Sequence, residues 1–331
     1  MKTIWLGAII LSLAVPVAAL AAAPDYKVVE RIKIPDGGFD YVTFDSATGR
    51  VYIARTDFTT VIDAKTGATS QLKSASHGHM VVPVAGTTLG VLPQGAGTVL
   101  IADTSKDVAV ATIPGGMGPD GATYDPFSKF VFVMNHRGGD ATVIDPIAGK
   151  AVATIPVGGT LEFPASDGAG KVFVNVEDQH QIAVIDVKMR KVVARYPMAG
   201  CEGPTGLAYV PDSKLLISSC DGVAKVLQAK DGKEVASLAI GHGPDAVIYD
   251  PMRQLAFIPC SGEGILEVIS VKDPAHISIV QHVATQTGTR TGAVDPQSGR
   301  LYLVATKLGP KTANGRAERL AGTYEALVVS P

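Results

Sequence analysis

Short runs of apolar, β-branched and aromatic residues recur along residues 24–331, and turns rich in Gly, Pro and Asp separate them. Runs of this length between such turns are typical of β-strands. The clearest runs are VYIA (51–54), VFVM (131–134), VFVN (172–175), LLIS (215–218), AFIP (256–259) and LYLV (301–304). The three-to-four-residue spacing of an amphipathic helix is absent over any stretch long enough to form one. The pattern therefore predicts an all-β protein.

One motif precedes these runs and returns with a period of about forty residues. Its best copies are GPDGATYDP (118–126), GPTGLAYVP (203–211) and GPDAVIYDP (243–251). The residues at the turn that ends the motif are Asp45, Asp125, Asp167, Val210, Asp250 and Asp295, with a degenerate copy near Ala85. Four short strands per repeat at this period are the signature of a β-propeller blade. The sequence therefore predicts a single seven-bladed β-propeller over residues 24–331.

The two ends of the chain predict how the ring closes. The last repeat supplies strands near 291–294, 301–305 and 325–330, one strand fewer than a blade needs. Residues 26–34 form a strand-like run with no repeat before them. We expect this N-terminal strand to complete the last blade, because a closed ring removes the open edges of the sheet.

Two segments, DPFSKFVFVMN (125–135) and TVIDPIAGK (142–150), resemble the repeat of the YVTN β-propeller family of exported bacterial proteins. The resemblance covers most of residues 26–331 and implies a seven-bladed propeller. It also implies that the loops on one face of the ring surround the central channel and carry the site. It implies no particular activity, because such propellers serve many roles on one scaffold.

The N-terminus has the pattern of a secretory signal. Lys2 precedes an apolar stretch at 4–15, and a small-residue tail follows at 19–21. We expect a signal peptide over residues 1–21 with cleavage at 21–23. The mature protein would then have no membrane span and would be periplasmic or secreted.

The near-neutral charge and the absence of certain motifs argue against nucleic acid, covalent haem and nucleotides as partners. With 29 basic and 31 acidic side chains, the chain has no excess of positive charge to hold nucleic acid. Its one tryptophan, Trp5, leaves with the predicted signal peptide. No CxxCH motif for covalent haem and no nucleotide-binding fingerprint occurs. We expect a monomer whose partner is a small molecule or an envelope protein. DNA binding and the handling of a redox metal or tetrapyrrole are weaker alternatives.

One column of the repeat places acidic residues at the mouth of the channel. It contains Asp40, Asp120, Glu162 and Asp245, with Thr205 and Arg290 at the equivalent positions of two other copies. Packed carboxylates repel one another, so a cation, a shared proton or Arg290 must offset them. The alternative is that each acid only caps its own turn.

Histidines gather in the loops of the same face. The candidate ligand-binding residues there, besides the acids, are Arg55, His79, Asn135, His136, His180, Glu202 and Lys307. Imidazole coordinates zinc, copper or iron, or acts as an acid–base group near neutral pH. The candidate ligands of a divalent metal are His77, His242, Asp120, Glu162 and Asp245. A metal-free pocket built from the same residues is the alternative.

Two further features lie on this face. Residues 307–323, with Lys311, Arg316 and Arg319, form either a basic lid over an anionic ligand or a solvated loop. Cys201 and Cys220 fall on neighbouring strands, so an oxidising compartment permits a disulfide between them. The alternatives are inert thiols, or soft metal ligands beside His242, with Cys260 too far around the ring to pair.

Two classes of function remain open. The first is a binding protein that uses the channel-mouth face to hold a small ligand, a metal or a protein partner. The second is a metal-assisted lyase or lactonase-type hydrolase at the same face, in which a cation polarises a carbonyl. Its candidate catalytic residues are His77 or His242 as the base and Arg290 as the holder of a substrate carboxylate or phosphate. No complete catalytic constellation occurs in the sequence, which favours the binding protein.

Overall fold

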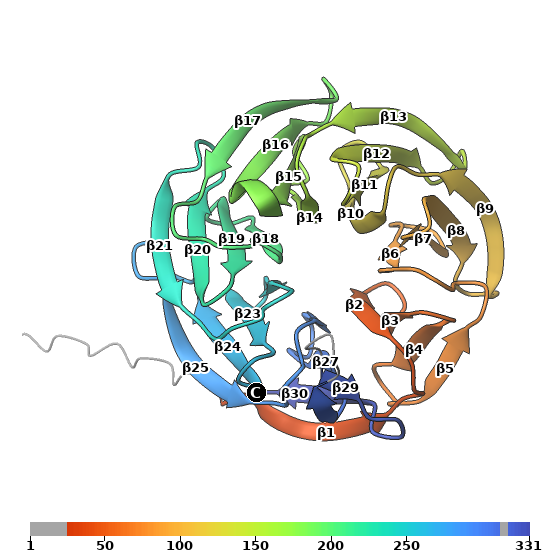
Figure 1. Cartoon of the computed structure of the whole chain (residues 1–331), viewed down its shortest axis with the longest axis vertical. Coiled ribbons are helices and arrows are strands. Elements are labelled where there is room, and N and C mark those ends of the chain that lie inside the picture. The colour runs from red at the N-terminus through yellow and green to blue at the C-terminus, as the bar shows by residue number, and fades with distance from the viewer. Residues whose placement is uncertain (1–24, 312–316) are drawn as a thin grey trace, which may run out of the picture.

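Each repeat folds into a blade because its apolar runs pair with one another in chain order. The computed structural model describes residues 25–311 and 317–331, and this part of the chain forms seven four-stranded antiparallel blades around a central channel (Figure 1). The predicted all-β, seven-bladed propeller is confirmed. In the first six blades the first strand lies nearest the channel and the fourth lies at the rim.

Blades 1 to 6 are numbered in chain order. Blade 1 contains β2 (Phe39–Asp45), β3 (Arg50–Arg55), β4 (Thr59–Asp63) and β5 (Thr69–Leu72). Blade 2 contains β6 (Val82–Pro83), β7 (Leu89–Gln94), β8 (Thr98–Asp103) and β9 (Val108–Pro114). Blade 3 contains β10 (Pro119–Asp125), β11 (Phe130–Asn135), β12 (Asp140–Asp145) and β13 (Lys150–Pro156). Blade 4 contains β14 (Leu161–Ser166), β15 (Lys171–Val176), β16 (Gln181–Asp186) and β17 (Lys191–Pro197). Blade 5 contains β18 (Leu207–Val210), β19 (Leu215–Cys220), β20 (Val223–Gln228) and β21 (Glu234–Ala239). Blade 6 contains β22 (Ile248–Asp250), β23 (Leu255–Cys260), β24 (Ile265–Ser270) and β25 (Ser278–Ala284).

The N-terminal strand closes the ring. From channel to rim, blade 7 contains β26 (Gly292–Val294), β27 (Leu301–Ala305), β30 (Glu325–Ser330) and β1 (Lys27–Lys33). β1 pairs antiparallel with β30, from Lys27 opposite Ser330 to Lys33 opposite Glu325. The Gln281 side chain of blade 6 also bonds to the backbone N–H and C=O of Tyr26. The predicted role of residues 26–34 is therefore confirmed.

The core lies between blades rather than inside any one of them. Phe132 and Met134 of β11 are fully buried and share one apolar cluster with Val172 and Val174 of the next blade. The rim strands are more open, as at the exposed Val108 of β9. Because each blade packs on its neighbours, the inner-strand ends are held in fixed positions around the channel.

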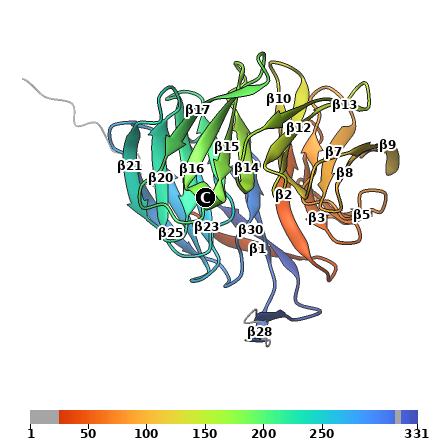
Figure 2. The ribbon, with the colours of Figure 1, turned by 45° about the horizontal axis from the view of Figure 1, so that its top comes forward.

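The insertion in blade 7 contains a hairpin of β28 (Leu308–Lys311) and β29 (Ala317–Arg319). Figure 2 shows β28 projecting away from the ring of blades. At the base of the insertion the Gly322 N–H donates to both carboxylate oxygens of Asp36, at 2.8 and 2.9 Å. The hairpin is thereby fixed to the loop that precedes blade 1. Arg316 of the predicted lid lies outside the described residues.

The cysteines of blade 5 are paired. Cys201 and Cys220 form a disulfide, with their Cα atoms 5.3 Å apart. Cys260 is a buried free thiol, and burial raises its pKa to about 12. A protonated thiol is a poor metal ligand. The structure therefore supports the bridge for Cys201 and Cys220 and an inert buried thiol for Cys260, and it does not support soft metal ligands beside His242.

Helical structure is almost absent from the described residues, where it is confined to the single 3-10 turn η1 (Glu177–Gln179). No helix within residues 25–311 and 317–331 has the length and apolar character required to cross a membrane. The predicted signal peptide, residues 1–21 with cleavage at 21–23, lies outside this part of the chain.

Candidate functional site at the channel mouth

Three inner strands carry the same irregularity, and each places an acid at the channel mouth. The register of β2 against β3 shifts by one residue at Asp40 and Tyr41. The same shift occurs in β10 at Asp120 and in β14 at Glu162. A β-bulge of this kind bends the strand and turns the side chain at the extra residue. The repeated bulge therefore explains why acids from three blades converge on one place.

The first cluster of site residues joins blades 1, 2 and 3. His79 Nδ1 lies 2.7 Å from Asp40 Oδ2 and 3.3 Å from Asp120 Oδ1. Ligand atoms of these three side chains all lie within 4.8 Å of one another, so they form a group that can hold a metal ion. The hydrogen bond to Asp40 raises the pKa of His79, against the opposing effect of its burial.

Local packing fixes the position of His79. Its backbone N–H donates to the carbonyl of Pro93, and its own carbonyl accepts from the N–H of Tyr41. The ring lies against Gly95, where a Cβ atom would come within 2.6 Å of His79 Nε2. Glycine is therefore required at position 95 if the imidazole is to reach Asp40.

The second cluster joins blades 3 and 4. Asp120, His136 and Glu162 again offer ligand atoms within 4.8 Å of one another. His136 Nδ1 lies 3.0 Å from Glu162 Oε1 and 3.1 Å from the carbonyl oxygen of Leu161. Both partners are acceptors, so Nδ1 carries a proton in this arrangement. The hydrogen bond that His136 donates to Glu162 is the largest cause that raises the pKa of His136 to about 9. The charges of Glu162 and Asp120 add to it, while burial opposes it.

Asp120 belongs to both clusters and is poorly satisfied by the protein itself. Burial is the largest cause that raises its pKa to about 6, and the charges of Asp40 and Glu162 add to it. Its Oδ1 is buried without a hydrogen bond among the described residues. The nearby His79 Nδ1 is better aligned with Asp40, which explains why the 3.3 Å contact is an ion pair only. A cation beside Asp120 would relieve both the repulsion and the missing contact.

Asp245 has a different partner from the other acids. Its Oδ2 lies 3.0 Å from Nε of Arg290, and it belongs to neither three-residue cluster. Burial nevertheless raises the pKa of Asp245 to about 7, against the attraction of Arg290. The charge of Asp245 in turn raises the pKa of Arg290. Asp245 was predicted as a metal ligand, whereas in the structure it pairs with Arg290, which comes from the neighbouring blade.

Tyr41 is a site residue that sequence analysis missed. Its ring packs edge to face on Phe163, with centroids 5.1 Å apart, and its hydroxyl lies 3.5 Å from Glu162 Oε2. Burial, with the charges of Asp245 and Glu162, raises the pKa of Tyr41 well above its usual value. The equivalent position holds Gly121, Gly206 and Ala246 in three other copies but the aromatic Phe163 in a fourth. The available sequence signal was therefore the pair of aromatic residues, Tyr41 and Phe163, at one position of the repeat.

Several other candidate residues serve the fold instead. Asn135 is fully buried and bonds to Asp140, Thr142 and the Gly116 N–H. The guanidinium of Arg55 is also buried and bonds to the carbonyls of the loop before blade 1 at Pro35, Gly37 and Gly38. Both side chains are buried and hydrogen-bond to loops and turns of the fold. The interpretation of Asn135 as a ligand-binding residue is therefore not supported.

The remaining candidates lie away from the two clusters. His242 Nδ1 lies 3.2 Å from Asp221 Oδ1, and both side chains are mostly exposed. His180 Nε2 lies 3.5 Å from an oxygen of the exposed Glu202. Among the described residues, neither His242 nor His77 belongs to a group of potential metal ligands. The histidines that belong to such groups are His79 and His136, rather than the predicted His77 and His242. Lys307 is exposed at the base of the hairpin and donates its backbone N–H to Thr323.

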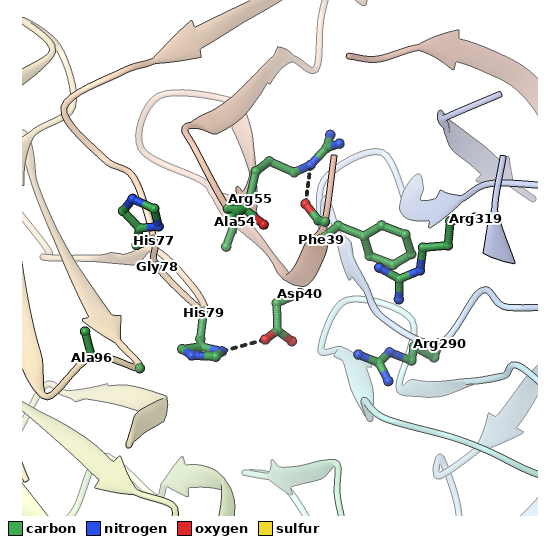
Figure 3. Close-up of a pocket in the computed structure, with 13 residues that line it drawn as sticks. Phe39, Asp40, Ala54, Arg55, His77, Gly78, His79, Ala96, Arg290 and Arg319 are labelled. Atoms are coloured by element: carbon green, nitrogen blue, oxygen red, sulfur yellow. Dashed lines mark hydrogen bonds and ion pairs between the residues drawn. The ribbon is translucent and has the colours of Figure 1, made fainter. Parts of the chain in front are cut away.

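A cavity of about 430 Å³ opens beside the first cluster. Asp40 and His79 form one part of its wall, and Arg290 and Arg319 form another. Figure 3 shows Asp40 between His79 on one side and Arg290 on the other. His77, which sequence analysis placed at a metal, lies on this wall in the left-handed conformation, with φ 56°.

Solved structures of similar shape come from unrelated settings. A chain of the hydrazine synthase of Kuenenia stuttgartiensis aligns with a TM-score of 0.72 at 14% identity, over 87% of this chain and 97% of that chain. A chain in the structure of the mitotic checkpoint complex aligns with a TM-score of 0.73 at 13% identity, over 100% and 99%. No family model and no curated protein matches the sequence. At these identities the similarity is one of fold, so the function has to be argued from this chain's own residues.

Proposed function

We propose that this protein is an exported binding protein that holds a divalent transition-metal cation at the mouth of its channel. The observation that carries the proposal is the arrangement of Asp120 between two imidazole–carboxylate clusters. Each cluster offers two carboxylate oxygens and, once the metal displaces the imidazole proton, one nitrogen. This donor set suits zinc and similar first-row metals. Mg²⁺ and Ca²⁺ prefer sites made of oxygen alone.

The electrostatics of the site support the same proposal. Four acids meet at the channel mouth, and within the described residues only Asp245 forms an ion pair with an arginine. Burial and mutual repulsion raise the pKa values of Asp120 and Asp245 to about 6 and about 7. Such carboxyls bind protons near neutral pH because burial and the neighbouring carboxylates disfavour their charged form. A divalent ion would take the place of those protons and remove the repulsion.

The disulfide supports the exported part of the proposal. Structural disulfides persist in oxidising compartments and are rare in the cytosol. The bridge between Cys201 and Cys220 is therefore consistent with the signal peptide expected at residues 1–21. Cleavage of that segment would release the propeller into the periplasm or the medium.

The test is metal analysis of the mature protein. Protein exported and purified without chelator is analysed by native mass spectrometry and elemental analysis, and zinc affinity is measured by calorimetry after chelator treatment. We expect at least one bound metal per chain. Asp120→Asn should weaken zinc binding by at least about 100-fold, because even the loss of an outer partner costs roughly 10- to 100-fold.

His242→Ala is the matched control, because His242 lies outside both clusters. It should bind zinc as the wild type does. A metal-free mature protein that takes up no zinc would contradict the proposal, as would an Asp120→Asn variant with wild-type affinity.

A further inference from the structure

The cavity beside the first metal-binding cluster has walls of opposite charge. Asp40 and His79 belong both to the cluster and to the cavity wall. Arg290 and Arg319 line the same cavity, and the ring of Phe39 lies beside Arg319 (Figure 3). A ligand in the cavity would therefore contact guanidinium groups at one end and face the proposed cation at the other.

Two contacts position Arg319, one with the ring of Phe39 and one at the base of the insertion. Its guanidinium carbon lies 4.2 Å from the centroid of the Phe39 ring, an arrangement in which the cation attracts the aromatic face. The base of the insertion is fixed by the bond from Gly322 to Asp36. The guanidinium is thus held at the cavity wall rather than carried by a loose loop.

Arg290 presents its charge from the other side. Its Nε faces Asp245 at 3.0 Å, and 39% of its side chain is exposed. Its two terminal Nη groups make no hydrogen bond to any described residue, although Arg290 lines the cavity. Guanidinium N–H groups form strong, charge-assisted and often two-pronged bonds to carboxylates.

Arg55 adds positive charge without being available to a ligand. Its hydrogen bonds to the carbonyls of Pro35, Gly37 and Gly38 occupy the guanidinium and shape the loop that borders the cavity. The cavity wall therefore has three arginines and one acid, Asp40. The balance favours an anion, and a volume of about 430 Å³ suits a small organic molecule.

We propose that this cavity binds a small organic carboxylate, with the carboxylate group on Arg290 and Arg319. A carboxylate group is favoured over phosphate because phosphate concentrates nearly two negative charges on one compact group, which Asp40 on the same wall repels more strongly than the single charge of a carboxylate. The carboxylate contact stands on the arginines alone. The cation should also strengthen binding of the carboxylate, because both would lie next to Asp40 and His79. This second effect rests on the proposed function.

The probe is succinate, a dicarboxylate that chelates zinc only weakly. Calorimetry measures its binding to the full mature chain, with and without zinc. Its neutral amide, succinamide, has the same shape without the charge, and inorganic phosphate tests the other anion class. We expect succinate to bind, succinamide not to bind, and phosphate to bind more weakly than succinate.

Arg319→Gln should weaken succinate binding by about tenfold or more, because a charge-assisted contact is lost while the hairpin keeps its attachment through Asp36. Lys311→Gln is the matched control, since it removes an equal charge from the same hairpin outside the cavity wall. Arg290→Gln gives a second, independent test from another blade.

The outcomes separate the two proposals. Failure of zinc-loaded protein to bind succinate overturns the carboxylate site, even if zinc binds as proposed. Equal affinity of the wild type and Arg319→Gln, equal binding of succinamide, or phosphate binding as tight as succinate overturns it as well. Succinate binding that Arg319→Gln weakens, in a protein that takes up no zinc, supports the carboxylate site and overturns the proposed metal function.

Discussion

Replacement of Asp120 by asparagine should change how the stability of the metal-free protein depends on pH. Burial, with the charges of Asp40 and Glu162, raises the pKa of Asp120 from 3.8 to about 6 in the folded protein. The folded state then binds this proton more tightly than the unfolded state does. The stability that the proton provides is fully present below about pH 4 and is lost as the pH rises through 6.

The size of the effect follows from the distance between the two pKa values. A gap of roughly two pH units corresponds to about 3 kcal/mol of unfolding free energy. Deprotonation of Asp245 likewise lowers the stability as the pH rises through 7. Deprotonation of His136 lowers it as the pH rises through 9. The metal-free wild type should therefore lose stability from pH 4 to pH 9, and Asp120→Asn should lack the part that falls between about pH 4 and 6.

Urea unfolding measures this directly. Circular dichroism is the suitable signal, because the one tryptophan of the chain, Trp5, lies in the predicted signal peptide. The protein is stripped of metal and unfolded at pH 4.5, 6 and 7.5. Asp57→Asn, which removes an exposed carboxylate from the loop after β3, is the control and should follow the wild type. The reasoning is refuted if Asp120→Asn and the wild type lose equal stability between pH 4.5 and 7.5.

Three further perturbations test the framework around the site. Gly95→Ala should displace the His79 ring, because the new Cβ would lie 2.6 Å from Nε2, and should weaken zinc binding about tenfold by calorimetry; unchanged affinity would show that the ring position does not matter. Removal of residues 24–34 takes β1 from blade 7 and should abolish cooperative thermal unfolding, whereas a cooperative transition would mean that the ring survives open. The double variant Cys201→Ser, Cys220→Ser should lose about 3 kcal/mol in urea unfolding, and a loss near zero would count against the bridge.

The repeat period explains why the fold was predictable from the sequence. A motif such as GPDGATYDP at 118–126 fixes the phase of each blade, so the number of blades and the closing strand both follow from counting. The same phase correctly brought Asp40, Asp120 and Glu162 together, because equivalent positions of a ring face one axis. The sequence therefore predicted those features of the fold and the site that depend on the repeat alone.

The histidines were not predictable in the same way, because their side-chain directions depend on local backbone geometry. His77 and His79 are two residues apart, yet only His79 faces Asp40. His77 lies exposed on the cavity wall and has φ 56°. No pattern in the sequence predicts this backbone conformation. His136 reaches Glu162 from the loop after β11, outside the acid column. A count along the repeat identifies positions, whereas a site depends on where each chain segment turns.

The contacts of Tyr41 decide how a ligand reaches the site. The hydroxyl of Tyr41 faces Glu162 at the polar mouth of the channel. Further along the inner strands lies a second cavity of about 290 Å³, with a largely apolar lining that includes Tyr41 and Phe163. The two rings pack edge to face, line that cavity and belong to the residues that directly follow Asp40 and Glu162. A hydrated cation gains nothing from apolar walls and is costly to strip of its water. The cation and the carboxylate would therefore enter and leave through the same mouth, where the hairpin carrying Arg319 stands beside the opening.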